Sequence, residues 1–107
     1  MSNIAKLSPR EQEVLEVIKM VPDPEVGINI VDLGLIYEVE ISDIQKTIDV
    51  DMTLSARGCP VGDTIILHVK TVLENMFPGY QAKVNLVWEP RWTPDMITPE
   101  GREQINY

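Results

Sequence analysis

The spacing of the apolar residues changes over residues 52–63, and this change limits the folds that are open to the chain. Before this stretch, apolar and polar residues alternate as in a β-strand, and after it the apolar residues recur at helical spacing. A half-buried strand and an amphipathic helix each need a surface to pack against, so the sequence predicts packed α and β layers. The stretch also contains Cys59, the only cysteine of the 107 residues.

Capping residues and apolar stripes predict three helices. A capping box that begins at Ser8 predicts a first helix, which ends near Met20. The stripe after Cys59 predicts a second helix over residues 60–77, with Pro60 at its first position. Thr98 suits the cap of a short final helix, because Pro99 follows it directly.

Alternating apolar residues predict three strands, over residues 35–41, 48–54 and 82–88. The first two form a hairpin, and matching their apolar faces sets Val39 opposite Val50. The same register sets acidic residues opposite one another on the other face, with Glu38 facing Asp51 and Glu40 facing Asp49. Each such like-charge pair costs up to about 1 kcal/mol. This acidic face is therefore either an ordinary solvated surface or a contact for a cation or a basic partner.

The order of these elements predicts an α+β fold. We expect a two-layer sandwich, α-β-β-α-β, with a three-stranded mixed sheet, both main helices on one face and a short C-terminal helix. The crossover through the second helix leaves the second and third strands parallel if they pair. The chain reads as a single domain over residues 1–107, with a loose N-terminus at 1–7 and a docked C-terminal tail at 89–107. The two tryptophans of that region are either hydrophobic anchors or a contact surface for another protein.

A long apolar loop follows the first helix. Residues 21–34 carry prolines that exclude a continuing helix, and their isoleucines, valines and leucine need burial. We therefore expect the loop to fold back on the domain and to hold its acidic residues in defined positions. These residues are Asp23, Glu25 and Asp32.

Composition limits the partners and the location of the protein. The net charge is −8, from 9 basic and 17 acidic residues, which argues against nucleic acid or an anionic membrane as the main partner. No stretch has the apolar length of a membrane span, and the N-terminus has no secretory signal pattern, so we expect a cytoplasmic protein.

Cys59 is the candidate functional residue. A thiol at a helix start faces free backbone N–H groups and the positive end of the helix dipole, which favour the thiolate. The alternative is a small buried hydrophobe. His68, the only histidine, lies nine residues further along the same helix, about 13–14 Å away, so the two cannot form a catalytic dyad within one chain. We therefore expect no enzyme.

Ligand counting narrows what this thiol can hold. A closed zinc or iron–sulfur site needs about four ligands, usually cysteine or histidine, and the chain offers one of each. A metal at Cys59 would therefore be weakly bound, shared across a dimer or received from a partner. Thr53 and Ser55 lead into the same turn and could support the site together with the acidic loop residues.

Four motifs resemble, in order, those of the MIP18 family, also called DUF59. They are Asp23-Pro24-Glu25, the stretch from Asn29 to Tyr37, Thr53-Leu54-Ser55 leading to Gly58-Cys59-Pro60, and the stretch from Trp88 to Pro94. The family includes SufT-like iron–sulfur maturation factors and PaaD-like proteins of the phenylacetate pathway. The PaaD-like branch usually carries a cysteine-rich C-terminal segment that is not found here, which favours the SufT-like branch.

The resemblance implies an iron–sulfur-assembly-like fold and a role in assembling clusters or delivering them to client proteins. It places the family cysteine on Cys59 and the supporting positions on Asp23, Glu25, Asp32, Thr53 and Ser55. The implied partners are iron–sulfur assembly proteins and client apoproteins, with a homodimer as a further expectation, and the implied cargo is a transient cluster or iron. The alternative is a PaaD-like scaffold or maturation subunit of a multicomponent oxygenase pathway.

Overall fold

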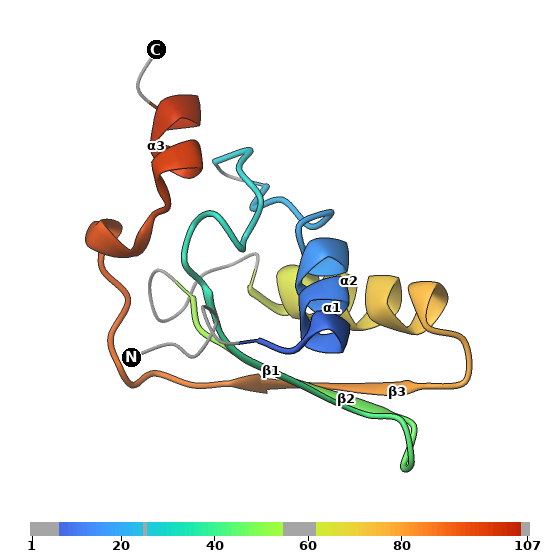
Figure 1. Cartoon of the computed structure of the whole chain (residues 1–107). Helices are drawn as coiled ribbons and strands as arrows, with labels where there is room; N and C mark the ends of the chain where they lie inside the picture. Colours follow the sequence, from blue (N-terminus) through green and yellow to red (C-terminus); the bar gives the residue numbers. More distant parts are fainter. Residues whose placement is uncertain (1–6, 25, 55–61, 106–107) are drawn as a thin grey trace.

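The computed structural model describes residues 7–24, 26–54 and 62–105. The elements follow the predicted order, α-β-β-α-β and then a short helix (Figure 1). In sequence they are α1 (Pro9–Ile18), β1 (Ile36–Ser42), β2 (Thr47–Met52), α2 (Gly62–Met76), β3 (Gln81–Leu86), the 3₁₀ turn η2 (Pro94–Met96) and α3 (Pro99–Ile105). The predicted start of the second helix at Pro60 lies outside the described residues.

The three strands form a mixed sheet in the order β1-β2-β3. β1 and β2 pair antiparallel, while β2 and β3 pair parallel, as the crossover through α2 requires. α1 packs on β1, α2 packs on β3, and the two helices touch each other on the same face of the sheet (Figure 1). The predicted α+β sandwich is confirmed.

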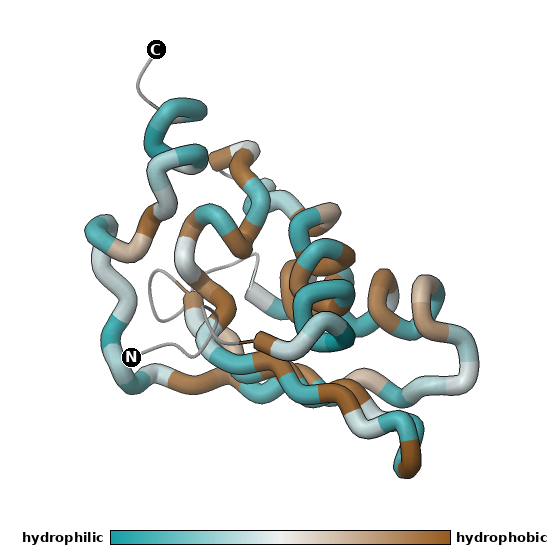
Figure 2. The backbone as a smooth tube through the Cα atoms, in the orientation of Figure 1, coloured by the Kyte–Doolittle hydropathy of each residue, from teal (hydrophilic) through white to brown (hydrophobic). Residues whose placement is uncertain are grey.

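The predicted hairpin register is also confirmed. Val39 pairs with Val50, and the four acidic residues lie opposite one another on the face away from the helices. β3 extends these acidic rows with Lys83 beside Asp49 and Asn85 beside Asp51. The Asn85 side chain donates a hydrogen bond to Asp51 at 3.0 Å. Figure 2 shows the resulting alternation of apolar and polar residues along the strands.

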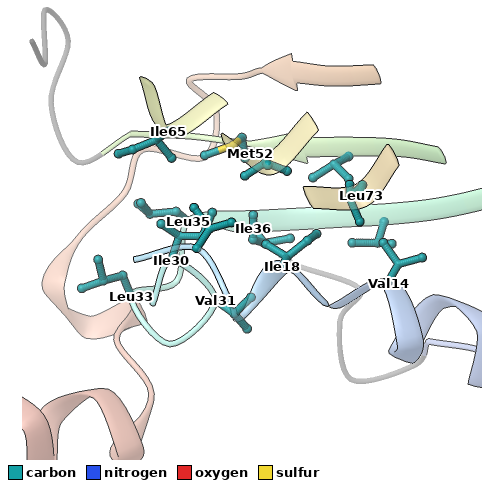
Figure 3. Close-up of a cluster of buried hydrophobic side chains, with 14 of the residues drawn as sticks. Val14, Ile18, Ile30, Val31, Leu33, Leu35, Ile36, Met52, Ile65 and Leu73 are labelled. Atoms are coloured by element: carbon teal, nitrogen blue, oxygen red, sulfur yellow. The ribbon is translucent and has the colours of Figure 1, made fainter. Parts of the chain in front are cut away.

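The core lies between the helices and the sheet. Ile18 of α1, Leu73 of α2 and Ile36 of β1 point toward one another there, each at most 1% exposed (Figure 3). The apolar residues of the loop after α1 are buried in the same cluster, as expected: Ile28, Ile30, Val31 and Leu33. No helix in the described part of the chain is long and apolar enough to cross a membrane.

Two positions differ from the sequence pattern. The alternation sets Ile36 on the polar face with Glu38, but Ile36 is 1% exposed and pairs with Met52. The cause is an irregularity of the ladder between Ile36 and Glu38, where one extra residue shifts the phase of the strand. Met76, expected in the buried stripe of α2, is 53% exposed because it is the last residue of the helix.

This phase shift makes a testable difference between two isoleucines. We expect Ile36→Ala to lower the free energy of unfolding by about 3 kcal/mol, because it removes a buried side chain and leaves a cavity. The matched control is Ile44→Ala at the hairpin tip, where the side chain is 95% exposed and the expected change is within about 0.5 kcal/mol. Urea unfolding measures both, and equal losses would contradict the assignment of Ile36 to the core.

Candidate functional site

The segment that carries Ser55 and Cys59 begins and ends at neighbouring points of the fold. Leu54 precedes it and Gly62, the first residue of α2, follows it. Gly62 is buried and lies against Leu54: a Cβ built on it would lie 2.7 Å from Cδ1 of this leucine, whose side chain would have to shift. Ser55, Cys59 and Glu25 themselves lie outside the described residues.

Thr53 leads from β2 toward this segment and is 1% exposed. Its N–H donates to the carbonyl of Leu35 at 2.8 Å, which holds the end of β2 beside the start of β1. The neighbouring Tyr37 is also buried, and burial raises the pKa of its phenol. Hydrogen bonding with the Thr53 side chain opposes this rise, and the negative charge of Glu89 adds to it. A buried hydroxyl and a protonated phenol therefore lie at the end of β2.

Asp23 is fixed by a tight turn in the loop after α1. Its N–H donates to Ile28 at 2.9 Å, and its carbonyl accepts the N–H of Gly27 at 2.7 Å. The residue is 6% exposed, one of two buried polar residues in the described part of the chain, and Thr53 is the other. The expectation that the loop holds Asp23 in a defined position agrees with this geometry.

Asp32 is bound at both its side chain and its backbone. Its carboxylate accepts from the side-chain amide of Asn29 at 2.8 Å, and its own N–H donates to the Asn29 oxygen at 2.9 Å. Its carbonyl accepts the N–H of Thr98 at 2.8 Å. In the described contacts, Asp32 thus links the loop after α1 to the C-terminal segment. Thr53 is linked to Leu35, the residue before β1, so these contacts do not join Asp32 to Thr53.

The C-terminal segment, residues 87–105, lies against the loop after α1 at the same end of the molecule (Figure 1). The Trp92 ring N–H donates to the carbonyl of Leu33 at 2.7 Å. The Tyr37 hydroxyl donates to the carbonyl of Pro90 at 2.7 Å. Both aromatic side chains therefore satisfy backbone carbonyls in partly buried positions.

Gly34 permits the close approach of this segment. Its φ is +81°, which favours glycine, and a Cβ there would overlap the carbonyl oxygen of Met96 and lie 2.8 Å from the Met96 Cβ. The sequence did not predict this contact, nor the hydrogen bonds of Trp92 and Tyr37 with Leu33 and Pro90. The glycine of the motif Asp32-Leu33-Gly34 was a signal for the contact, because glycine adopts a positive φ at no steric cost.

The described residues form a partial site. Thr53 and Leu54 precede the segment that carries Cys59, Gly62 follows it, and Tyr37 lies beside Thr53. No group of three or more histidine, cysteine, aspartate or glutamate residues that could hold a metal ion occurs among the described residues. His68 is exposed on α2. The polar groups that these residues offer are the buried hydroxyl of Thr53 and the phenol of Tyr37.

Known proteins share this sequence and this fold. A family model described as iron–sulfur cluster assembly protein matches residues 11–86. The chain is similar to the Fe-S protein maturation auxiliary factor SufT of Staphylococcus aureus (strain USA300), at 51% identity over 79 residues, which are 74% of this chain and 89% of the relative. A crystal structure of a DUF59 domain from Bacillus anthracis matches with a TM-score of 0.86 and 30% identity, over 96% of this chain and 97% of that chain.

A weaker likeness reaches a different class of protein. One component of a putative 1,2-phenylacetyl-CoA epoxidase of Escherichia coli (strain K12) is 28% identical over 108 residues, which cover 98% of this chain and 63% of that protein. More than a third of that relative therefore has no counterpart in this chain.

The close approach at Gly34 predicts a large effect of one added methyl group. Gly34→Ala meets both an unfavourable φ and the Met96 backbone, so we expect it to cost about 3 kcal/mol and to displace the C-terminal segment. The control is Gly79→Ala, which has a φ of +88° but nothing within 4 Å, and should cost about 1–2 kcal/mol. Urea unfolding and tryptophan fluorescence measure the two effects. Equal losses with unchanged fluorescence would contradict the contact.

The buried phenol of Tyr37 predicts a pH dependence. Its folded-state pKa lies above the usual value of 10.0, so its contribution to stability is present below pH 10 and is lost as the pH rises through the folded-state pKa. We expect Tyr37→Phe to lower stability by about 1 kcal/mol at pH 7, because the Pro90 carbonyl loses its donor. The gap between wild type and variant should narrow above pH 10 in unfolding experiments. A gap that stays constant up to pH 11 would contradict this account.

Proposed function

Because this chain belongs to the family of iron–sulfur cluster assembly proteins that contain the DUF59 domain, we propose that it is an accessory factor for the maturation of iron–sulfur proteins, with Cys59 as its functional thiol. The general role in iron–sulfur protein maturation follows from the family and from the SufT likeness. The role of the thiol is our proposal. We place the protein in the cytoplasm and assign it no catalytic turnover.

One observation carries the thiol proposal: Leu54, the residue before the segment that contains Cys59, lies against Gly62, the residue after that segment and the first of α2. In the sequence, Cys59 precedes Gly62, the first residue of a 15-residue helix, by three residues. The free N–H groups and the dipole of a helix start favour a thiolate over a thiol. Asp63 in the first turn takes up part of this positive potential, which favours a moderately polarised thiol.

We propose that the supporting residues influence the thiol through where the fold holds them. Thr53, buried at the end of β2, is the last well-anchored polar group before the segment with Ser55 and Cys59. Asp23 is the buried carboxylate of the loop, with Glu25 two residues further on. We propose that these groups bias the presentation of the thiol, and that Asp32 contributes by joining the loop to the C-terminal segment.

In this function an iron–sulfur cluster is cargo. One cysteine supplies one of the roughly four ligands that a cluster needs, so the remaining ligands come from a donor protein, a client apoprotein or a second copy of this chain. The protein would thus act during a transfer between partners, with Cys59 as a transient ligand. Its proposed partners are iron–sulfur assembly proteins and their clients.

The second candidate is a scaffold or maturation subunit of a multicomponent oxygenase pathway, in which Cys59 is only packing. The likeness to the epoxidase component supports it, at lower identity and lower coverage of the relative than the SufT likeness. The two candidates differ in whether the thiol is needed.

Complementation tests the thiol. A Staphylococcus aureus strain without its own SufT is supplied with this chain, with Cys59→Ser or with His68→Ala, and the activity of a resident iron–sulfur enzyme is measured against its protein level. We expect wild type and His68→Ala, a change at an exposed position of α2, to restore the activity. Cys59→Ser should fall to the level of the empty vector.

Folding and metal binding are controlled with the purified proteins. Cys59→Ser should unfold at the same urea concentration as wild type and should lose any chromophore that forms during anaerobic reconstitution with iron and sulfide. Full complementation by a well-folded Cys59→Ser protein would refute the thiol proposal and leave the scaffold function.

A further inference from the structure

The outer edge of β3 is only partly closed. Successive residues of a strand direct their backbone N–H and C=O groups to opposite edges of the strand. The N–H groups of Gln81 and Val87 point toward β2, where they donate to the carbonyls of Lys46 and Met52. Ala82 directs its groups outward. Its N–H donates to Glu74 at 3.1 Å, and its carbonyl accepts from Lys70 at 3.0 Å. A pair of side chains from α2 therefore caps this end of the edge.

The cap is a stable one at neutral pH. Lys70 and Glu74 also pair with each other at 2.8 Å. The hydrogen bonds from Lys70 and from the Ala82 N–H hold the pKa of Glu74 below its usual value, so the carboxylate stays ionised.

Beyond this cap the edge is open as far as residues 7–24, 26–54 and 62–105 are concerned. Val84 and Leu86 share the phase of Ala82, so their N–H and C=O groups point outward in the same way. These groups have no hydrogen-bond partner within the described part of the chain. Two donors and two acceptors thus face outward beside the sheet, the arrangement to which a further strand can bind.

An apolar side chain of α2 lies on the same side of the molecule. Leu67 precedes Lys70 by one helical turn and Glu74 by two, so all three lie on the side of α2 that faces the β3 edge. α2 and β3 run in opposite directions (Figure 1). At about 1.5 Å per helical residue and 3.3 Å per strand residue, Leu67 lies at about the level of Val84.

The two large apolar residues around the open edge are incompletely buried. Leu67 is 62% exposed and Leu86 is 38% exposed. Leu86 shares its face of the sheet with Ala82 and Val84, so its side chain lies on the helix side as Leu67 does. A strand beside β3 would therefore cover both leucines with one inward-facing apolar side chain.

The other edge of the sheet is protected. β1 carries Glu38 and Glu40 and an irregularity at its start, features that discourage strand addition. A second copy of the chain fits the β3 edge poorly, because strands pair at about 4.8 Å while two packed helices need about 8–10 Å. With α2 reaching over the edge through Lys70 and Glu74, two such helices would collide.

We propose that the open edge of β3, formed by Val84 and Leu86 under Leu67, binds an extended segment of a partner protein as a fourth strand. The side chains of this segment that lie on the helix side of the sheet are apolar and contact Leu67 and Leu86. The segment is basic overall, because the chain carries a net charge of −8 and four carboxylates lie on β1 and β2 on the face away from the helices, one and two strands beyond Lys83. Backbone hydrogen bonds supply affinity, and the apolar contacts with Leu67 and Leu86 supply selectivity. This surface does not involve Cys59, so its test is independent of the proposed function.

The probe is a seven-residue acetylated and amidated peptide, Lys-Val-Lys-Leu-Lys-Val-Lys. We expect it to bind with a Kd of about 100 μM and to slow the amide hydrogen exchange of Val84 and Leu86 about tenfold at saturation, as followed by NMR. The amides of Lys83 and Asn85, which face β2, should change little. The peptide with glutamate in place of each lysine should bind at least about fivefold more weakly.

Side-chain variants distinguish binding of the peptide at this edge from nonspecific binding elsewhere on the protein. Leu67→Lys and Leu86→Lys each remove apolar contact from the edge and should weaken binding about five- to tenfold. The control is Ile44→Lys at the hairpin tip, an exposed position away from the edge, which should stay within about twofold of wild type. All three changes are at exposed positions, and urea unfolding verifies that each variant is folded.

Three results would overturn the proposal. One is unchanged exchange of Val84 and Leu86 at millimolar peptide. Another is equal binding by the Leu86→Lys and Ile44→Lys variants. The third is a wild-type dimer in sedimentation that dissociates on Leu86→Lys, which would assign the edge to a second copy of the chain.

Discussion

The pairing of β2 with a neighbour on each side is the interaction on which the rest of this structure depends. It satisfies the backbone of the central strand and places Ile48, Val50 and Met52, each fully buried, beneath the helices. Because β1 joins β2 by a hairpin and β3 joins it in parallel, the chain between β2 and β3 must cross over through α2. The start of α2 therefore returns to the end of β2, where Gly62 meets Leu54.

A second set of contacts uses backbone groups of the loop after α1. The carbonyls of Asp32 and Leu33 accept hydrogen bonds from Thr98 and Trp92, and Gly34 lies against Met96. The loop thus holds the C-terminal segment, and that segment in turn covers Tyr37. In the described contacts, the motif Asp32-Leu33-Gly34 supplies hydrogen bonds and a close backbone approach. These structural contacts account for a short polar residue at position 32 and a glycine at position 34.

α2 has three parts with different tasks. One face, with Ile65, Val69 and Leu73, fills the core. The side toward β3 caps the backbone of Ala82 and leaves Leu67 exposed above the open edge. Its first turn adjoins the segment with Cys59. A proposed cluster-transfer site and a proposed strand-binding surface therefore meet on one helix and can be altered separately.

The sequence by itself determined the order of the elements, the hairpin register and the burial of the loop after α1, because each depends on the spacing of apolar residues and on prolines that are visible locally. It made β2 and β3 parallel only if they pair, and the tertiary structure decided that they do. Ligand counting and helix spacing likewise limited the roles of Cys59 and His68. The tertiary structure decided what depends on partners distant in the chain. Ile36 entered the core only through a shifted ladder, and Gly34 was required by Met96. Among the described residues, the edge of β3 was closed at Ala82 and left open at Val84, because side-chain reach and backbone direction are set once the layers are packed.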